Sequence, residues 1–218
     1  MSKAWSDVDA YIAEHLMPAD ASLAGALAAN EAAGLPAIDV SPPQGKFLHI
    51  LARLVGARRV LEIGTLGGYS TIWLARALPE GGQVVTLEVS AHHARTAAAN
   101  IAEAGLSHLV TIHVGAALET LPSLPGDAPF DLIFIDADKR SNPFYFDWAL
   151  KLSHTGSVIV VDNVVRDGMV LDAATTDPDI QGIRRFFGLL GNDPRVTATA
   201  LQTVGGKGWD GFAFAIVN

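Results

Sequence analysis

The chain has 218 residues, half of them hydrophobic, and carries a formal net charge of −8 at pH 7. This length fits one α/β domain with a sizeable core. The acidic balance argues against nucleic acid as a partner, because binding to a phosphate backbone normally requires a basic face. The absence of cysteine excludes disulfides, thiolate catalysis and cysteine zinc sites.

The sequence shows no sign of membrane insertion or export. No apolar run reaches the roughly 20 residues that span a bilayer. The start of the chain is acidic, with Asp7, Asp9 and Glu14, and lacks the basic segment and apolar core of a signal peptide. We therefore expect a cytoplasmic protein without a membrane partner.

The first 40 residues predict a helical extension outside the sheet pattern. Residues 7–16 carry apolar side chains at helical spacing and stop before Pro18, and an alanine-rich helix follows over residues 19–33. This extension is either an oligomer contact or a lid over the site. Ser41, followed by two prolines, then begins a helix that continues over residues 47–55. We therefore expect a single domain with an extension (1–40) and a core (41–218).

The core predicts strands that alternate with helices. A short apolar strand over residues 60–63 is followed by a glycine turn (64–68) and a helix (69–78). The further predicted strands cover residues 84–89, 110–114, 130–135, 157–161, 196–204 and 212–217, and the further helices cover residues 91–104, 117–121, 143–152 and 180–190. This order predicts a doubly wound, mostly parallel seven-stranded sheet covered on both faces. The link between the last two strands is too short for a crossover helix, so they should pair antiparallel at one edge.

The glycine turn after the first strand is the predicted ligand site, because ligands of open parallel sheets bind at the carboxyl ends of the strands. We place Glu62 in this turn region, where its charge would repel a pyrophosphate and attract an ammonium or sulfonium group. Gly64, Gly67 and Gly68 also do not follow the G-x-G-x-x-G spacing of dinucleotide sites. The alternative is an ordinary strand-to-helix connection.

An acid at the end of the next strand suggests which ligand binds. Glu88 is placed to accept hydrogen bonds from both hydroxyls of a ribose, although it could instead be a solvated strand-end residue. Together with Glu62 and with the apolar Ala116 and Ala117 after the third strand, it indicates a nucleoside site without a pyrophosphate clamp. S-adenosylmethionine fits this description.

Two further strands end in oxygen-bearing side chains. Asp136, Asp138 and Lys139 follow the strand 130–135, and Asp162 and Asn163 follow the strand 157–161. If these strands are neighbours, two carboxylates and an amide converge in a site suited to Mg²⁺, Ca²⁺ or Mn²⁺. The acids could instead cap turns. Lys139 either takes a proton from a metal-bound hydroxyl or is a solvated lysine paired with Asp138.

At these residues the chain resembles the cation-dependent O-methyltransferases of small molecules, in the bacterial branch of the caffeoyl-CoA and catechol O-methyltransferase family. The resemblance covers the chain from about residue 42 to the end. It is carried by the motifs Leu61-Glu-Ile-Gly-Thr-Leu-Gly-Gly-Tyr-Ser70, Phe130-Asp-Leu-Ile-Phe-Ile-Asp-Ala-Asp-Lys139, Val161-Asp-Asn-Val-Val165 and Trp209-Asp-Gly-Phe-Ala213. It implies the Rossmann-like fold of the class I S-adenosylmethionine-dependent methyltransferases.

The resemblance also implies roles for single residues. The implied S-adenosylmethionine site consists of Val40, Glu62, Gly64, Thr65, Ser70, Glu88, Ala117 and Asp136. The implied cation ligands are Asp136, Asp162 and Asn163, and the implied catalytic residues are the general base Lys139 with Asp136 and Asn163. The acceptor is expected beside Asp136, Asp138, Arg166 and Asp167. Members of the family are commonly homodimers.

We therefore expect methyl transfer from S-adenosylmethionine, leaving S-adenosylhomocysteine, to a hydroxyl of a small catechol-like phenol. The basic residue that plant members use for a coenzyme A ester is not recognisable before Tyr11, which argues against such an ester as acceptor. Two alternatives remain: an NAD-dependent oxidoreductase on a similar sheet, and a non-catalytic S-adenosylmethionine-binding sensor. Methylation of RNA or protein is disfavoured by the acidic balance.

Overall fold

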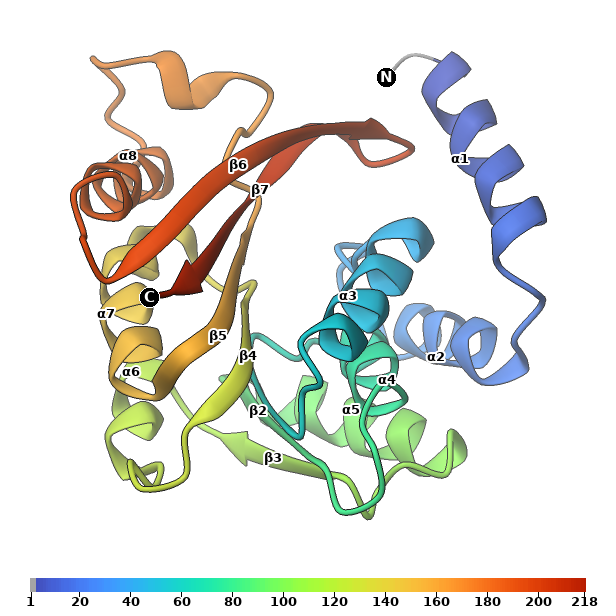
Figure 1. The fold of residues 1–218 in the computed structure, drawn as a ribbon. Helices are drawn as coiled ribbons and strands as arrows, with labels where there is room; N and C mark the ends of the chain where they lie inside the picture. Colours follow the sequence, from blue (N-terminus) through green and yellow to red (C-terminus); the bar gives the residue numbers. More distant parts are fainter. Residues whose placement is uncertain (1–2) are drawn as a thin grey trace.

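The computed structural model describes residues 3–218 and contains one sheet flanked by helices (Figure 1). The strands are β1 (Arg59–Ile63), β2 (Gln83–Glu88), β3 (Val110–Val114), β4 (Phe130–Ile135), β5 (Ser153–Asp162), β6 (Val196–Gly205) and β7 (Gly208–Val217). The α-helices are α1 (Lys3–Leu16), α2 (Ala21–Ala32), α3 (Pro42–Leu54), α4 (Tyr69–Ala75), α5 (Ala91–Glu103), α6 (Ala117–Thr120), α7 (Asn142–Lys151) and α8 (Pro178–Leu190). A short 3-10 helix, η2 (Lys139–Ser141), precedes α7.

The seven strands lie in the order β3-β2-β1-β4-β5-β7-β6. The pairs from β3 to β5 are parallel, and β7 runs antiparallel to both β5 and β6. The prediction of a mostly parallel sheet with antiparallel pairing at one edge is therefore confirmed. The chain leaves β1 toward β2 and β3 and returns to β4 on the other side, so the strand order reverses between β1 and β4. Ligands of open sheets bind at such a reversal.

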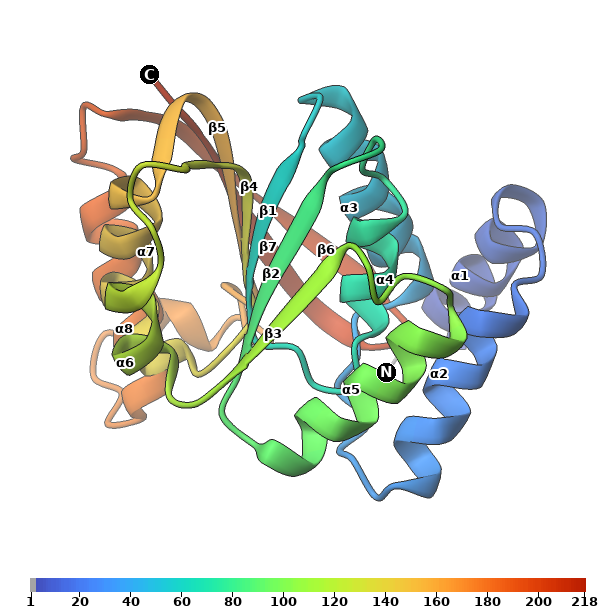
Figure 2. The same cartoon turned by 90° about the horizontal axis from the view of Figure 1, so that it is seen from below.

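Helices cover both faces of the sheet, as Figure 2 shows, with α6, α7 and α8 on one side and α3, α4 and α5 on the other. Successive residues of a strand point to opposite faces. In β1, Leu61 and Ile63 therefore enter the core on the α7 side, and Val60 enters the core on the α3 side. All three are fully buried, which is why the strand shows an apolar run rather than an alternating pattern.

The extension contains two helices outside the sheet, as predicted. Helix α2 packs against α4 and α5 and buries Leu23, Ala26 and Asn30, whereas α1 buries no residue. Helix α3 begins at the predicted cap, because the hydroxyl of Ser41 accepts a hydrogen bond from the backbone N–H of Gln44 at 3.4 Å. No helix within residues 3–218 has the length and hydropathy needed to cross a membrane.

Four predicted element ends differ from the structure by three residues or more. Helix α1 begins at Lys3 and not at residue 7, and strand β7 begins at Gly208 and not at residue 212. The helix predicted over residues 69–78 stops at Ala75, because the N–H groups of Ala77 and Leu78 bond to carbonyls three residues back and Pro79 cannot continue a helix. The strand predicted over residues 157–161 begins at Ser153, which pairs with Phe130 before an irregularity in the register.

Helix α8 approaches η2 so closely that only glycine fits at the contact. A Cβ atom at Gly182 would overlap the backbone oxygen of Lys139 and the Cα atom of Arg140. We expect Gly182→Ala to lower the free energy of unfolding by about 1–3 kcal/mol, the usual range for overpacking, and to displace Lys139. Gly188→Ala, in the same helix but with nothing within 4 Å, should instead stabilise the protein by roughly 0.5–1 kcal/mol. Urea unfolding measures both changes, and an equal effect of the two variants would contradict the packing argument.

Candidate active site

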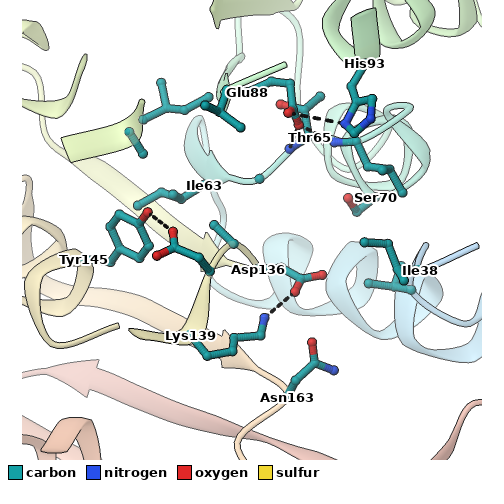
Figure 3. Close-up of a pocket in the computed structure, with 18 of the residues that line it drawn as sticks. Ile38, Ile63, Thr65, Ser70, Glu88, His93, Asp136, Lys139, Tyr145 and Asn163 are labelled. Atoms are coloured by element: carbon teal, nitrogen blue, oxygen red, sulfur yellow. Dashed lines mark hydrogen bonds and ion pairs between the residues drawn. The ribbon is translucent and has the colours of Figure 1, made fainter. Parts of the chain in front are cut away.

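A cavity of about 500 Å³ lies at the carboxyl ends of the parallel strands. Gly64 and Thr65 line it after β1, Glu88 at the end of β2, Asp136 after β4 and Asn163 after β5. Figure 3 shows Glu88 and His93 at one end of this cavity and Lys139 and Asn163 at the other. The topology therefore brings together side chains from four neighbouring strand ends, as the sequence predicts.

Glu88 is a fixed acceptor and not a solvated strand-end residue. The residue is 6% exposed. One carboxylate oxygen accepts hydrogen bonds from the backbone N–H groups of Leu66 at 2.8 Å and Thr65 at 3.3 Å. The other accepts one from Ser90 at 2.9 Å and lies 3.5 Å from Nδ1 of His93. Donors on both oxygens hold the carboxylate at the cavity wall, where it can accept further hydrogen bonds from a ligand.

The glycine turn allows β1 and β4 to end almost in contact. Gly64 has φ of 101°, and a Cβ atom there would overlap the backbone oxygen of Asp136. The N–H of Asp136 donates to the carbonyl of Ile63 at 2.8 Å. A side chain at position 64 would therefore push Asp136 away from the cavity.

The position predicted for Glu62 is wrong, because this residue lies in β1 and not in the turn. Its side chain is fully buried and does not line the cavity. Glu62 accepts hydrogen bonds from the hydroxyls of Ser70 at 2.6 Å and Thr86 at 2.7 Å, and burial raises its pKa to about 7. Ser70 does line the cavity. Glu62 therefore acts on the site by orienting Ser70.

The two carboxylates predicted as cation ligands lie close to each other. Asp162 is buried, and its pKa is raised to about 7 by burial and by the charge of Asp136. One oxygen of Asp162 accepts the N–H of Asn163 at 2.8 Å, and the other accepts the amide of Gln44 at 2.6 Å. Gln44 was missed by the sequence analysis, since no local pattern links a residue at the start of α3 to the end of β5.

Lys139 pairs with Asp136 and not with Asp138. Its Nζ atom lies 2.6 Å from Oδ1 of Asp136, and the lysine is 7% exposed (Figure 3). Asp138 instead accepts hydrogen bonds from the hydroxyl groups of Tyr145 at 2.5 Å and Ser141 at 2.6 Å. The alternative of a solvated lysine paired with Asp138 is therefore wrong.

The donor set near this end of the cavity fits a divalent cation, although only two of its members, Asp136 and Asn163, line the cavity and Asp162 is buried without lining it. No group of three or more His, Cys, Asp or Glu side chains arranged for a metal occurs in residues 3–218. The predicted set, Asp136, Asp162 and Asn163, contains only two carboxylates. Its third ligand is an amide, so the set is of a different kind from such a group. Lys139 forms an ion pair with Asp136, and the charges of both residues act on the carboxyl group of Asp162. The excess negative charge and the hard oxygen atoms suit Mg²⁺, Ca²⁺ or Mn²⁺.

Most of the other predicted site residues line the cavity, but not all of them do. Val40, Thr65, Ala117, Asp138 and Arg166 line the cavity, whereas Asp167 does not. Arg166 and Asp167 belong to the loop after β5, which is held because Asp210 accepts the backbone N–H groups of Val165 and Arg166, each at 3.0 Å. The motif that begins at Trp209 thus positions a cavity loop.

Among the cavity residues that the sequence analysis missed are Ile38, Asp39, His93, Tyr145 and Asp179. Ile38 and Asp39 come from the link between α2 and α3. This link has no regular spacing, and the family resemblance placed only its Val40 in the cofactor site.

Comparison with known proteins gives these residues a family context. The family model described as O-methyltransferase matches residues 21–209. The catechol O-methyltransferase of Mycobacterium tuberculosis is 55% identical over 212 residues, which cover 97% of this chain and 96% of that protein. The solved structure of the Bacillus cereus O-methyltransferase in complex with S-adenosylhomocysteine has a TM-score of 0.98 at 56% identity. A second solved structure is that of O-methyltransferase TomG from Streptomyces achromogenes, which is involved in tomaymycin synthesis and was solved in complex with S-adenosylmethionine. Its TM-score is 0.96 and its sequence identity is 53%. Both comparisons cover 100% of this chain and 100% of the other chain.

Proposed function

The chain belongs to the O-methyltransferase family and is an S-adenosylmethionine-dependent enzyme, and from this premise we propose that it methylates one hydroxyl of a small catechol-like acceptor with a divalent cation beside it. The observation that carries this proposal is the ion pair of the buried Lys139 with the half-buried Asp136, 2.6 Å apart, next to Asn163 in the cavity. A base and a set of oxygen ligands therefore lie where two oxygens of one acceptor can reach both.

We assign the nucleoside end of the cofactor to the Glu88 end of the cavity. Glu88 already accepts backbone hydrogen bonds on both oxygens, so its position is fixed before a ligand arrives and it can accept the ribose hydroxyls. Ala117 lines the same cavity and offers apolar contact to the adenine ring of the cofactor. The reacting end of the cofactor then lies toward Asp136.

Asp136, Asp162 and Asn163 would hold the cation, which supplies Lewis-acid chemistry that lowers the pKa of a bound hydroxyl. The residues of the chain do the rest. Gln44 holds one oxygen of Asp162 at 2.6 Å, and the cavity wall keeps the acceptor near the methyl donor, where proximity provides much of the rate. The proposed acceptor of the hydroxyl proton is Nζ of Lys139, which Asp136 holds at 2.6 Å.

The proposed acceptor is a vicinal diol such as a catechol, as the name of the Mycobacterium tuberculosis relative suggests. Arg166 lines the cavity and can bind an acidic group on such an acceptor. A coenzyme A ester is not part of the proposal. Family membership argues against the NAD-dependent oxidoreductase, and the buried base Lys139 argues against the non-catalytic sensor. We place the reaction in the cytoplasm, which suits a chain without cysteine.

The general base is tested by Lys139→Ala. We expect turnover of catechol to fall by roughly two to four powers of ten, the usual contribution of a general base. The affinity for S-adenosylhomocysteine, measured by isothermal titration calorimetry, should remain, because Lys139 lies at the opposite end of the cavity from Glu88. Turnover within threefold of the wild type would refute this role.

Cation and acceptor are tested together by methyl transfer to catechol and to phenol, with Mg²⁺ or with EDTA. We expect turnover of catechol only with Mg²⁺, and little turnover of phenol, because phenol lacks the second oxygen. Asp162→Ala should weaken cation binding by at least about tenfold through loss of a carboxylate ligand, whereas Asp147→Ala, an exposed residue of α7, should not. Activity that persists in EDTA would show that the cation is not required.

We also propose that two copies of the chain associate. Strand β6 is one edge of the sheet, opposite β3, and its residues between Val196 and Gly205 are all exposed. Helix α1 packs beside β6 and leaves Val8 and Leu16 exposed. Bare edge strands are rarely left uncovered. Light scattering should therefore give twice the chain mass of 22.9 kDa, and the mass of one chain at micromolar concentration would overturn the proposal.

A further inference from the structure

A chain of buried hydrogen bonds connects the extension to the glycine turn. The amide of Asn30, in α2, donates to Oδ1 of Asp39 at 2.9 Å. The amide of Asn100, in α5, donates to Oδ1 of Asn30 and to the backbone oxygen of Gly67, each at 2.9 Å. Three segments that are distant in the sequence are thus joined to Asp39, which lines the cavity.

The two asparagines have little freedom to move. Asn30 is 3% exposed and Asn100 is 6% exposed. A Cβ atom at Gly67 would overlap the side chain of Asn30, so the turn and the amide are in close contact. Because buried amides are costly unless they are hydrogen-bonded, this arrangement is strongly preferred over alternatives. It fixes Oδ1 of Asp39 relative to the glycine turn.

Among the acids of the cavity wall within residues 3–218, Asp39 is the one whose side-chain partners amount to a single neutral donor, the amide of Asn30. Of the other acids that line the cavity, Asp136 pairs with Lys139, Asp179 with Arg140, Asp138 with two hydroxyl groups and Glu88 with three backbone N–H groups. Asp39 has no ion pair within residues 3–218, since the nearby Lys207 donates instead to the carbonyl of Ala37 at 3.1 Å.

The surroundings of Asp39 favour a cationic ligand. It is half-buried, and burial raises its pKa. A desolvated carboxylate is costly unless a positive charge or several donors compensate it. An ammonium group provides both a full charge and up to three N–H donors. The half of the carboxylate that Asn30 leaves free is therefore suited to such a group.

We propose that Asp39 binds the α-ammonium group of S-adenosylmethionine and S-adenosylhomocysteine, and that Asn30 and Asn100 are positioning residues that hold Asp39 for this contact. The inference rests on the proposed function, in which Glu88 binds the nucleoside end and the methyl group lies toward Asp136. The amino-acid end of the cofactor is then left for the remaining acid of the cavity, Asp39. The extension thereby becomes part of the cofactor site.

The test compares two ligands, S-adenosylhomocysteine and its desamino analogue, in which hydrogen replaces the α-amino group. Isothermal titration calorimetry gives the affinity of each for the wild type and for Asp39→Asn. We expect Asp39→Asn to weaken S-adenosylhomocysteine about tenfold or more, the size of a hydrogen bond to a charged group, and to leave the affinity for the desamino analogue within twofold. Equal weakening of both ligands, or no weakening, overturns the proposal.

Further variants separate positioning from folding. Asn30→Ala should reduce the preference for S-adenosylhomocysteine over the desamino analogue, because Asp39 loses the donor that orients it. If this variant keeps the preference of the wild type, the positioning role is refuted. Asp147→Asn removes one charge from an exposed residue of α7 and should change neither affinity. Thermal unfolding verifies that each variant is folded. If the wild type binds neither ligand, the proposed function fails, whereas wild-type binding without discrimination by Asp39→Asn rejects only this inference.

Discussion

The site depends on the close approach of the chain just after β1 and β4. Gly64 has a positive φ and no Cβ, so the backbone of Asp136 can lie against it, and the N–H of Asp136 bonds to the end of β1 at 2.8 Å. This contact sets the distance between the glycine turn and the side chains that are proposed to take part in the reaction. Because it lies at the reversal of the strand order, the loops on either side of it diverge and leave a cavity between them.

Negative charge is concentrated around this contact and is compensated unevenly. Glu62 is buried beneath the cavity with hydroxyl donors, and Asp162 is buried beside Asp136 with a neutral amide from Gln44. Lys139 supplies one positive charge for the pair of strand-end carboxylates. An acidic, partly desolvated cavity of this kind selects cationic ligands, which accounts for the combination of a sulfonium cofactor and a divalent cation in the proposed reaction.

The extension is joined to this site by polar contacts as well as by packing. Helix α2 buries Asn30 against α5, and through Asn30 the link before α3 brings Asp39 to the cavity wall. Helix α1 differs, since it buries no residue and contacts the exposed edge strand β6. The two helices therefore have separate roles in the proposal, one in binding the cofactor and one in association of two chains.

The sequence by itself determined the sheet, its helices and the strand-end residues Glu88, Asp136 and Asn163, because apolar periodicity and the glycine turn are local signals and the carboxyl ends of parallel strands must share one edge. Only the tertiary structure decided that Glu62 is buried in β1 beneath Ser70, that Lys139 pairs with Asp136, and that Gln44 and Asp39 reach the site. Gln44 and Asp162 are 118 residues apart, and such contacts follow from the packing of whole elements, which leaves no trace in the spacing of neighbouring residues.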